Sequence, residues 1–264
     1  MRFLTLYSGS GGNATYIEIG DTALLIDAGK SARRLCSALC EIGSSIEKIS
    51  AILITHEHSD HVSALETLTK KHRIPIHMPS GCAARFSGER YFALRERAVL
   101  HPPISSFEIN GLGVTSFPTS HDSYASVGYR IEFLDGDRVR SFGIATDTGY
   151  VTKAVQQGLF GCEAVVLESN HDEEMLRCGP YPRDLKQRIL SKTGHLSNSD
   201  SALFAAHLAK YGTRAFILAH LSEENNTPDT ALDTFLSTVA DTSVRVAAAD
   251  PERPTEIEIQ ELTL

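Results

Sequence analysis

The chain begins with a series of short apolar runs, each closed by glycine, aspartate or serine. These runs are rich in residues that favour β-strands, and several of them alternate apolar with polar positions, as half-buried strands do. The same pattern returns after Pro75, so we expect two β-rich halves. The expected strands are residues 2–8, 14–20, 22–29, 51–56, 74–79, 111–121, 126–134, 141–149, 163–171 and 214–222, with a final strand pair around 243–249 and 256–264.

Four other segments show the helical period, in which apolar residues return every three or four positions. In residues 31–43, Leu35, Leu39 and Ile42 have this spacing, and Gly43 follows as a stop signal. The other expected helices are residues 63–72, 198–212 and 229–240. Helices between two β-rich halves are typical of sheets that pack face to face and are covered by helices. No Gly/Ser linker or compositional break divides the chain, so we expect a single domain over residues 1–264.

Composition narrows the classes of function. The chain has 264 residues, of which 42% are hydrophobic, and a formal net charge of -8 without any basic tract. A role with nucleic acid therefore has to depend on local charge. Met1 is followed directly by a strand-like run and no apolar run has the length of a membrane span, so we expect a cytoplasmic protein without a membrane partner. Five cysteines without a CxxC pair argue against a disulfide framework or a cysteine zinc site.

Potential metal ligands gather at the C-terminal ends of the expected strands, where open sheets place their ligand sites. The densest group is the HxHxDH sequence within THEHSDH, which directly follows an apolar run. Imidazoles and carboxylates without thiolates suit zinc, manganese or iron. Because one metal takes about three or four protein ligands, a set of this size predicts two adjacent metals. The candidates are His56, His58, Asp60 and His61 from HxHxDH, and Asp27, His121, Asp147 and His220 from other strand ends.

HxHxDH is the signature of the metallo-β-lactamase superfamily, and the chain resembles the YycJ/WalJ-type branch of that superfamily. The resemblance extends over almost the whole chain and implies an α/β fold, a four-layer αββα sandwich of two mixed sheets flanked by helices. Ser126 and His171 depart from it, since proline and tyrosine are expected there. The sequences that carry the resemblance are SGSGGNA, LLIDAG, SHD with VGY, TDTGY, LESNHD, GPYPRDLKQRI, GHLSN and AHLSEENN.

The resemblance also implies a division of the ligands between two divalent metal ions, with zinc or manganese the first candidates and iron a further one. His56, His58 and His121 would hold one metal, Asp60, His61 and His220 the other, and Asp147 would bridge them. Such a pair activates a shared water, which places Asp60 and Asp147 in the catalytic set. Asp27 would accept a hydrogen bond from a ligating imidazole. From the sequence alone, a turn-forming aspartate is an equal alternative.

His195 is the third expected catalytic residue. It precedes the expected helix at residues 198–212, with the N-cap at Asn198 or Ser199, so free amides and the positive helix end would face the same space. In the nuclease branches of the superfamily a histidine near the scissile phosphate matches it, which implies that His195 protonates the leaving oxygen or holds the phosphate. The alternative is a histidine that only caps the helix. Further candidates for substrate and phosphate binding are Ser8, Ser10, Asn13, Arg183, Lys186, Ser197 and Asn198.

The resemblance implies a nuclease that removes nucleotides from the 5′ end of DNA, with a link to DNA repair. Single-stranded or end-frayed DNA is the expected substrate, and RNA is a second candidate. Asp147 and His195 are only 48 residues apart, which leaves no room for the domain inserted in β-CASP nucleases, and the tRNA-binding arm of ribonuclease Z is not found. Two alternatives stay open: a hydrolase of a small carbonyl ester such as a lactone or thioester, and an iron-binding redox module. The sequence does not predict the oligomeric state.

Overall fold

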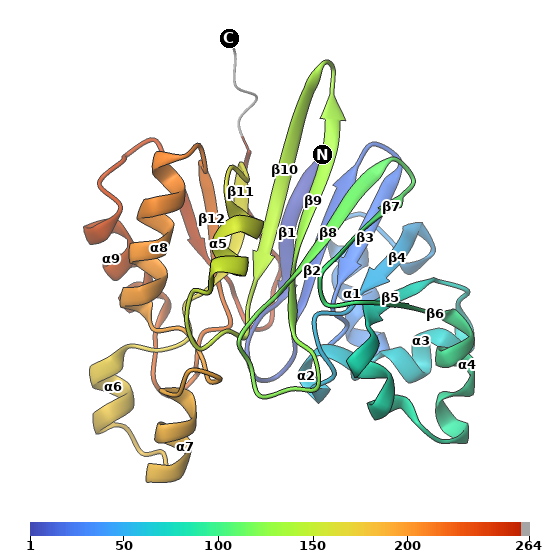
Figure 1. Cartoon of the computed structure of the whole chain (residues 1–264), viewed down its shortest axis with the longest axis horizontal. Coiled ribbons are helices and arrows are strands. Elements are labelled where there is room, and N and C mark those ends of the chain that lie inside the picture. Colours follow the sequence, from blue (N-terminus) through green and yellow to red (C-terminus); the bar gives the residue numbers. More distant parts are fainter. Residues whose placement is uncertain (260–264) are drawn as a thin grey trace.

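Two seven-stranded sheets form the centre of the protein, whose structure, a computed structural model, describes residues 1–259 (Figure 1). The first sheet has the order β14-β1-β2-β3-β4-β5-β6 and the second β13-β12-β11-β10-β9-β8-β7. The strands of the first sheet are β1 (Arg2–Tyr7), β2 (Ala14–Ile19), β3 (Thr22–Ile26), β4 (Ile49–Leu53), β5 (Ile76–Pro79), β6 (Ala98–His101) and β14 (Thr255–Glu256). Those of the second are β7 (Ser105–Ile109), β8 (Leu112–Pro118), β9 (Val127–Asp135), β10 (Arg138–Ala145), β11 (Ala164–Glu168), β12 (Ala215–Ala219) and β13 (Arg245–Ala248).

Alternation along the strands divides the apolar side chains into three layers of core. In β3, Leu24 and Ile26 pack between the two sheets, whereas Leu25 packs toward the helices outside the first sheet. Because successive side chains of a strand point to opposite faces, a strand buried on both faces reads as a continuous apolar run, as TALLI does. A third cluster lies between the second sheet and its helices. The result is a four-layer αββα sandwich of two mixed sheets, which confirms the expected fold class.

Helices cover the outer face of each sheet. The first sheet is covered by α1 (Ala32–Glu41), α3 (Leu65–Lys71) and α4 (Phe92–Arg97), and the second by α5 (Lys153–Leu159), α8 (Asn198–Lys210) and α9 (Pro228–Thr238). At the lower end of the view in Figure 1 lie α2 (Ser59–Val62), α6 (Glu173–Cys178) and α7 (Arg183–Ile189). The short 3₁₀ helices are η1 (Ile46–Lys48), η2 (Ser80–Phe86) and η3 (Glu89–Tyr91).

The four helices with clear apolar periodicity form within about two residues of their expected limits. The expected final strand pair is wrong, because β13 pairs with β12 in the second sheet and β14 pairs with β1 in the first. Residues 260–264 of that expectation lie outside the described part of the chain. The pattern did not predict β6, β7, α4, α5 or α6. Each of these elements has seven residues or fewer, too few to establish a period.

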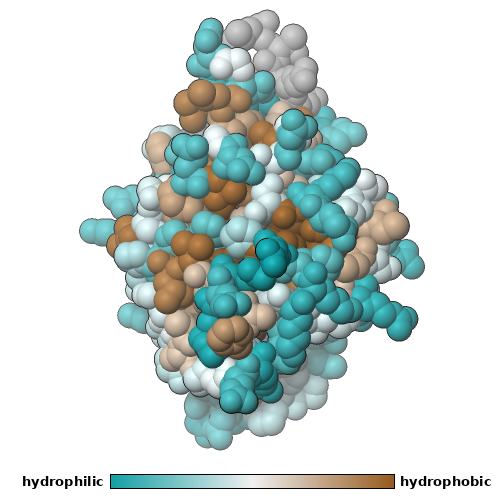
Figure 2. All heavy atoms as spheres, turned by 90° about the vertical axis from the view of Figure 1, so that its right-hand side faces the viewer, coloured by the Kyte–Doolittle hydropathy of each residue, from teal (hydrophilic) through white to brown (hydrophobic). Residues whose placement is uncertain are grey.

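The outer surface over α3, α4 and β6 carries scattered apolar side chains separated by hydrophilic ones (Figure 2). Phe92, Val99 and Leu100 are among the exposed apolar residues of α4 and β6. Across residues 1–259, no helix combines the length and apolar character needed to cross a membrane. All five cysteines are free, as expected from their spacing.

Candidate metal centre

The candidate centre lies where β3, β10, β11 and β12 end. The pair β3 and β4 runs parallel in the first sheet, and β10, β11 and β12 run parallel in the second. The carboxyl ends of parallel neighbours meet at one edge of a sheet, where ligand sites form. Asp27 directly follows β3, Asp147 lies two residues past β10, Glu168 ends β11 and His220 directly follows β12. The two sheets therefore deliver side chains to one place.

Three of these residues have a left-handed backbone. The φ angle is 64° at Asp27, 55° at Asp147 and 57° at His220. Side-chain-bearing residues seldom adopt this region, and such strain costs about 1–3 kcal/mol and persists where the surroundings impose it. Here the amide of Asp27 donates to the carbonyl of Leu53, and that of His220 donates to Oγ of Ser8. The strained turns are thus fixed by hydrogen bonds at the strand ends.

The HxHxDH residues come from the loop after β4 and from α2. The turn after Asp27 packs directly against α2: the amide of Ala28 donates to the carbonyl of His61 over 2.8 Å. Gly29 is required there, because a methyl group at that position would overlap the carbonyl of Asp60. The turn after β3 therefore helps to fix the segment that carries four of the candidate ligands.

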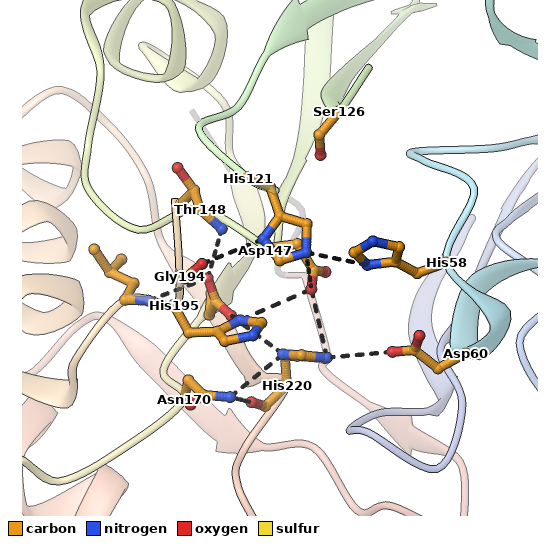
Figure 3. A network of polar contacts seen from close by, with 12 residues as sticks. His58, Asp60, His121, Ser126, Asp147, Thr148, Asn170, Gly194, His195 and His220 are labelled. Carbon is orange, nitrogen blue, oxygen red and sulfur yellow. Dashed lines mark hydrogen bonds and ion pairs between the residues drawn. The ribbon is translucent and has the colours of Figure 1, made fainter. Parts of the chain in front are cut away.

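The seven expected ligands gather in groups whose ligand atoms lie within 4.8 Å of one another, and the first group is His56, His58 and His121. Two further groups join Asp147 to His56 and His61, and to Glu168, His195 and His220. His121 Nε2 lies 3.3 Å from His58 Nδ1, and the ring of His56 lies 4.6 Å and 5.0 Å from those of His58 and His121. The remaining group is Asp60, His61 and His220. Asp147 lies between the first group and this one, with Oδ1 3.8 Å from His121 Nε2 and 3.6 Å from His220 Nε2, and Oδ2 3.4 Å from His61 Nε2 (Figure 3).

In three of these histidines, His61, His121 and His220, the second ring nitrogen has an oxygen neighbour outside the ligand groups or at their edge. Nδ1 of His61 lies 2.8 Å from Asp27 Oδ2, and the amide and hydroxyl of Thr55 also donate to Asp27. Nδ1 of His220 lies 3.2 Å from Glu168 Oε1, and Nδ1 of His121 lies 3.3 Å from the carbonyl of Gly194. Such contacts fix the tautomer and turn the other nitrogen toward a metal. Asp27 therefore occupies the orienting position expected of it.

Unpaired atoms indicate that this donor set fits cations. No described residue supplies a hydrogen-bond partner for the buried Nε2 atoms of His56 and His220 or for Oδ2 of Asp147. Leaving such groups unsatisfied costs about 1–3 kcal/mol each, so native structures rarely do so without a partner such as an ion. Imidazole nitrogens and carboxylate oxygens in this number suit two divalent ions.

The electrostatics divide the candidate ligands. Burial alone would lower the pKa of His61 and of His220, but neighbouring carboxylates, Asp27 at His61 and Asp147 at His220, outweigh it, so the pKa of His61 rises well above its usual value and that of His220 rises to about 10. Burial lowers the pKa of the His56 imidazole well below its usual value, which keeps it neutral. Burial alone would raise the pKa of Asp147, but the imidazoles of His220 and His61 outweigh it and hold that pKa well below the usual range. Asp60 behaves alike, since the neighbouring imidazoles of His220 and His61 outweigh burial and lower its pKa. The carboxylates are therefore ionised at neutral pH.

His195 lies beside the centre and is paired with a residue that the sequence analysis missed, Glu168. Nδ1 of His195 lies 2.7 Å from Oε1 of Glu168, and the ring lies 5.2 Å from that of His121 and 5.0 Å from that of His220. The His195 side chain is 20% exposed and Glu168 is fully buried. Glu168 ends β11 just as Asp147 follows the neighbouring β10, so the strand-end rule could have identified it.

Several residues expected to bind substrate instead hold the protein together. Oγ of Ser8 accepts the amide of His220, and Nδ2 of Asn13 donates to Gly9 and to Oδ2 of Asp60. Asn13 thus contacts a candidate ligand, while Ser10 is exposed on the loop.

The start of α8 also differs from expectation. Its N-cap is Ser197, whose hydroxyl accepts the amide of Asp200, and not Asn198 or Ser199. The amide of Leu196 donates to Glu168 and that of Asn198 to the carbonyl of His171. The expected free amides beside His195 are therefore used within the protein at these positions. The Asn198 side chain bonds to Ser169 and Asn226.

The basic residues before His195 lie on α7 and its flanks. Arg183 is exposed, whereas Nζ of Lys186 donates to the carbonyls of Arg177 and Gly179 and thereby caps α6. Arg188 reaches the site instead, since its Nε donates to Oδ2 of Asp122 over 2.6 Å. The other oxygen of Asp122 lies 3.4 Å from His121 Nε2.

Comparisons with known proteins identify the family. The sequence model described as "Beta-lactamase superfamily domain" matches residues 22–221. The chain is 36% identical over 251 residues to exodeoxyribonuclease WalJ of Streptococcus pneumoniae strain D39, covering 93% of this chain and 90% of that protein. It is 33% identical over 273 residues to exodeoxyribonuclease YycJ of Bacillus anthracis, covering 98% of both.

Among solved structures, the metallo-beta-lactamase fold protein YhfI from Bacillus subtilis aligns with a TM-score of 0.69, covering 97% of this chain and 100% of that one. At 16% identity this likeness bears on the fold alone. The family model spans most of the chain, and both WalJ and YycJ exceed 30% identity over nearly their full length. The chain therefore belongs to the metallo-β-lactamase superfamily, in its YycJ/WalJ-type branch.

Proposed function

We propose that this protein is a dinuclear metal-dependent phosphodiesterase that removes nucleotides from the 5′ end of DNA. The observation that carries the proposal is the His195–Glu168 pair beside the overlapping groups of candidate metal ligands. A centre that used metals alone would not need a further histidine fixed at 2.7 Å by a buried carboxylate. Protonation of a leaving alkoxide is the step that such a histidine serves.

His56, His58 and His121 would hold one ion, and Asp60, His61 and His220 the other, with Asp147 shared between them. Zinc or manganese fits this set of nitrogen and oxygen donors, and iron is a further candidate. When bound, two such ions supply Lewis-acid chemistry that activates a water and stabilises charge on the phosphate.

Two residues of the chain then serve the reaction: Glu168 orients His195, and His195 donates a proton to the leaving oxygen. Glu168 accepts from Nδ1 of His195, so Nε2 of His195 is the nitrogen available to the substrate. Burial alone would raise the pKa of Glu168, but the imidazoles of His195 and His220 outweigh it and lower that pKa to about 2. The ionised carboxylate holds the His195 ring through Nδ1, so that Nε2 can donate to the departing 3′ oxygen.

The relatives support the choice of substrate and direction. Both WalJ and YycJ are exodeoxyribonucleases by name, and they match this chain over nearly their whole length. We therefore propose single-stranded or end-frayed DNA as the substrate, with RNA as a competitor to be tested, and a cytoplasmic location. A DNA-repair role follows the same analogy.

The substitution His195→Ala tests the chemical step. We expect kcat on a DNA phosphodiester to fall about 10²- to 10⁴-fold, as for loss of a general acid, while metal content by mass spectrometry stays native. His207→Ala, at an exposed histidine of α8, is the matched control and should keep full activity. Unchanged cleavage by His195→Ala would remove this role. Hydrolysis of lactones or thioesters in place of DNA would favour the carbonyl-ester alternative.

A further inference from the structure

Beside the candidate centre lies an open pocket of about 460 Å³ that none of the assigned roles uses. A volume of this size lies within the range of small-ligand sites. One of its walls is His58, a candidate metal ligand, and another is Asp122, which touches His121. The pocket therefore borders the candidate metal centre. Its lining residues are Glu57, His58, Ser59, Arg85, Asp122, Ser123 and Tyr124.

Tyr124 presents an exposed aromatic ring from a fixed backbone. Its side chain is 71% exposed, yet its amide donates over 2.9 Å to the buried carboxylate of Glu57. The loop also packs closely on η2, because a methyl group at Gly81 would lie 2.7 Å from Cβ of Ala125. Sγ of Cys82 lies 3.5 Å from both Glu57 and Ala125. An exposed aromatic ring on an anchored backbone is available to stack on a base, as aromatic side chains do in sites that bind single strands.

The polar groups of the pocket leave one cation and one hydroxyl free. The Glu57 carboxylate is engaged by Tyr124 and Cys82, and the Asp122 carboxylate is paired with Arg188. Within residues 1–259, Arg85 forms no ion pair, so its charge is uncompensated in the pocket. Oγ of Ser123 is buried and has no partner among the described residues. An anionic, hydrogen-bonding ligand with a flat aromatic part matches these groups.

We propose that this pocket binds one of the two nucleotides that flank the scissile phosphate. Its base stacks on Tyr124, and Arg85 contacts one of its phosphates. This inference rests on the proposed nuclease function and adds a subsite to it. It explains how a chain with a net charge of -8 can hold a nucleic acid end through local contacts.

Binding and cleavage test the subsite separately. Calorimetry with manganese present compares deoxyadenosine 5′-monophosphate with 2-deoxyribose 5-phosphate, which lacks the base. Cleavage compares single-stranded DNA with oligonucleotides that are abasic at the first or second position. The variants are Tyr124→Ala, Tyr124→Phe and Arg85→Ala. Tyr211→Ala, an exposed tyrosine just past the far end of α8, is the matched control.

We expect Tyr124→Ala to weaken binding of the nucleotide roughly 5- to 100-fold and to leave binding of the sugar phosphate unchanged, as loss of one stacked base predicts. Tyr124→Phe should bind both ligands as the native protein does, and Arg85→Ala should weaken the binding of both ligands. In cleavage, Tyr124→Ala and one abasic substitution should have non-additive effects on KM.

The subsite would be overturned, even if the protein digests DNA, if Tyr124→Ala weakened the binding of both ligands equally. It would also be overturned if Tyr124→Ala weakened the binding of neither ligand. If the native protein cleaves no DNA, the nuclease function fails, and the calorimetry alone decides the subsite. Additive effects of Tyr124→Ala and both abasic substitutions would also count against it.

Discussion

At the scale of single residues, Glu168 links the candidate metal ligands to the proposed acid. One oxygen of its carboxylate lies 2.7 Å from His195 and 3.2 Å from His220, and the other accepts the amides of Thr148 and Leu196. A single buried side chain thus orients two imidazoles with different roles and fixes the loops that carry them. Its substitution should affect both roles together.

We predict that Glu168→Gln lowers kcat about 10- to 100-fold and weakens metal binding, because one carboxylate oxygen is replaced by an NH2 group, which cannot accept from the two imidazoles or from the amides of Thr148 and Leu196. Steady-state kinetics and metal titration measure the two effects. Glu163→Gln, at the residue just before the same strand and at its opposite end from Glu168, is the control. Native kinetics in Glu168→Gln would show that the carboxylate does not position His195.

The candidate ligands were predictable because the sequence pattern that marks them lies within a few neighbouring residues. HxHxDH places four candidate residues within six positions, and Asp147 and His220 stand at strand ends. Glu168 has the same position but lies in LESNHD, where the sequence gives no metal-like spacing. The roles of Ser8 and Asn198 could not be predicted, because their hydrogen-bond partners are 212 and 28 residues away in sequence.

At the scale of elements, three strands are joined by an aromatic stack at the edge of the sandwich. His77 of β5 stacks on His101 of β6 with ring centroids 5.1 Å apart, and Nδ1 of His77 lies 2.9 Å from Nε2 of His101. His101 stacks in turn on Phe107 of β7, in the second sheet, at 3.9 Å. The stack therefore connects the edge strands of the two sheets.

This stack should make stability depend on pH. Burial, aided by the neighbouring His101, lowers the pKa of His77 to about 4, while an unfolded histidine titrates near 6.5. Between these values the unfolded chain binds the extra proton, so stability falls as the pH falls from about 6.5 to 4. We predict that His77→Gln reduces this loss. Thermal unfolding with chelator present at each pH, which excludes metal release, measures it. If stability plotted against pH fell equally for the native protein and for His77→Gln, the prediction would be contradicted.

The elements that the pattern missed are short and depend on tertiary contacts. The strands β6 and β7 have four and five residues. Val99 and Leu100 of β6 are both exposed, and β7 alternates exposed with half-buried positions and fully buries only Ile109, so neither strand gives a strong apolar pattern. The helix α6 begins at Asp172, whose side chain accepts two amides of its first turn, but only Leu176 is buried. Longer elements such as α8 bury a repeating face and were therefore predictable.

At the scale of the whole molecule, a net charge of -8 must accommodate a polyanionic substrate. We predict that binding to single-stranded DNA depends only weakly on salt, with a slope of about -1.5 in log K against log salt, as for about two neutralised phosphates. Fluorescence anisotropy with calcium in place of manganese measures the slope over a salt series. A slope several times steeper would indicate an extended basic track and contradict binding through local contacts.

The central claim, a two-metal centre that cleaves DNA from its 5′ end, has one direct test. Single-stranded DNA labelled at either the 5′ or the 3′ end is digested with manganese or zinc by the native protein, Asp147→Ala and His195→Ala. The account predicts stepwise release of the 5′ label by the native protein and little or none by either variant. A native protein that binds two metals yet leaves both labelled strands intact, or releases the 3′ label first, would contradict it.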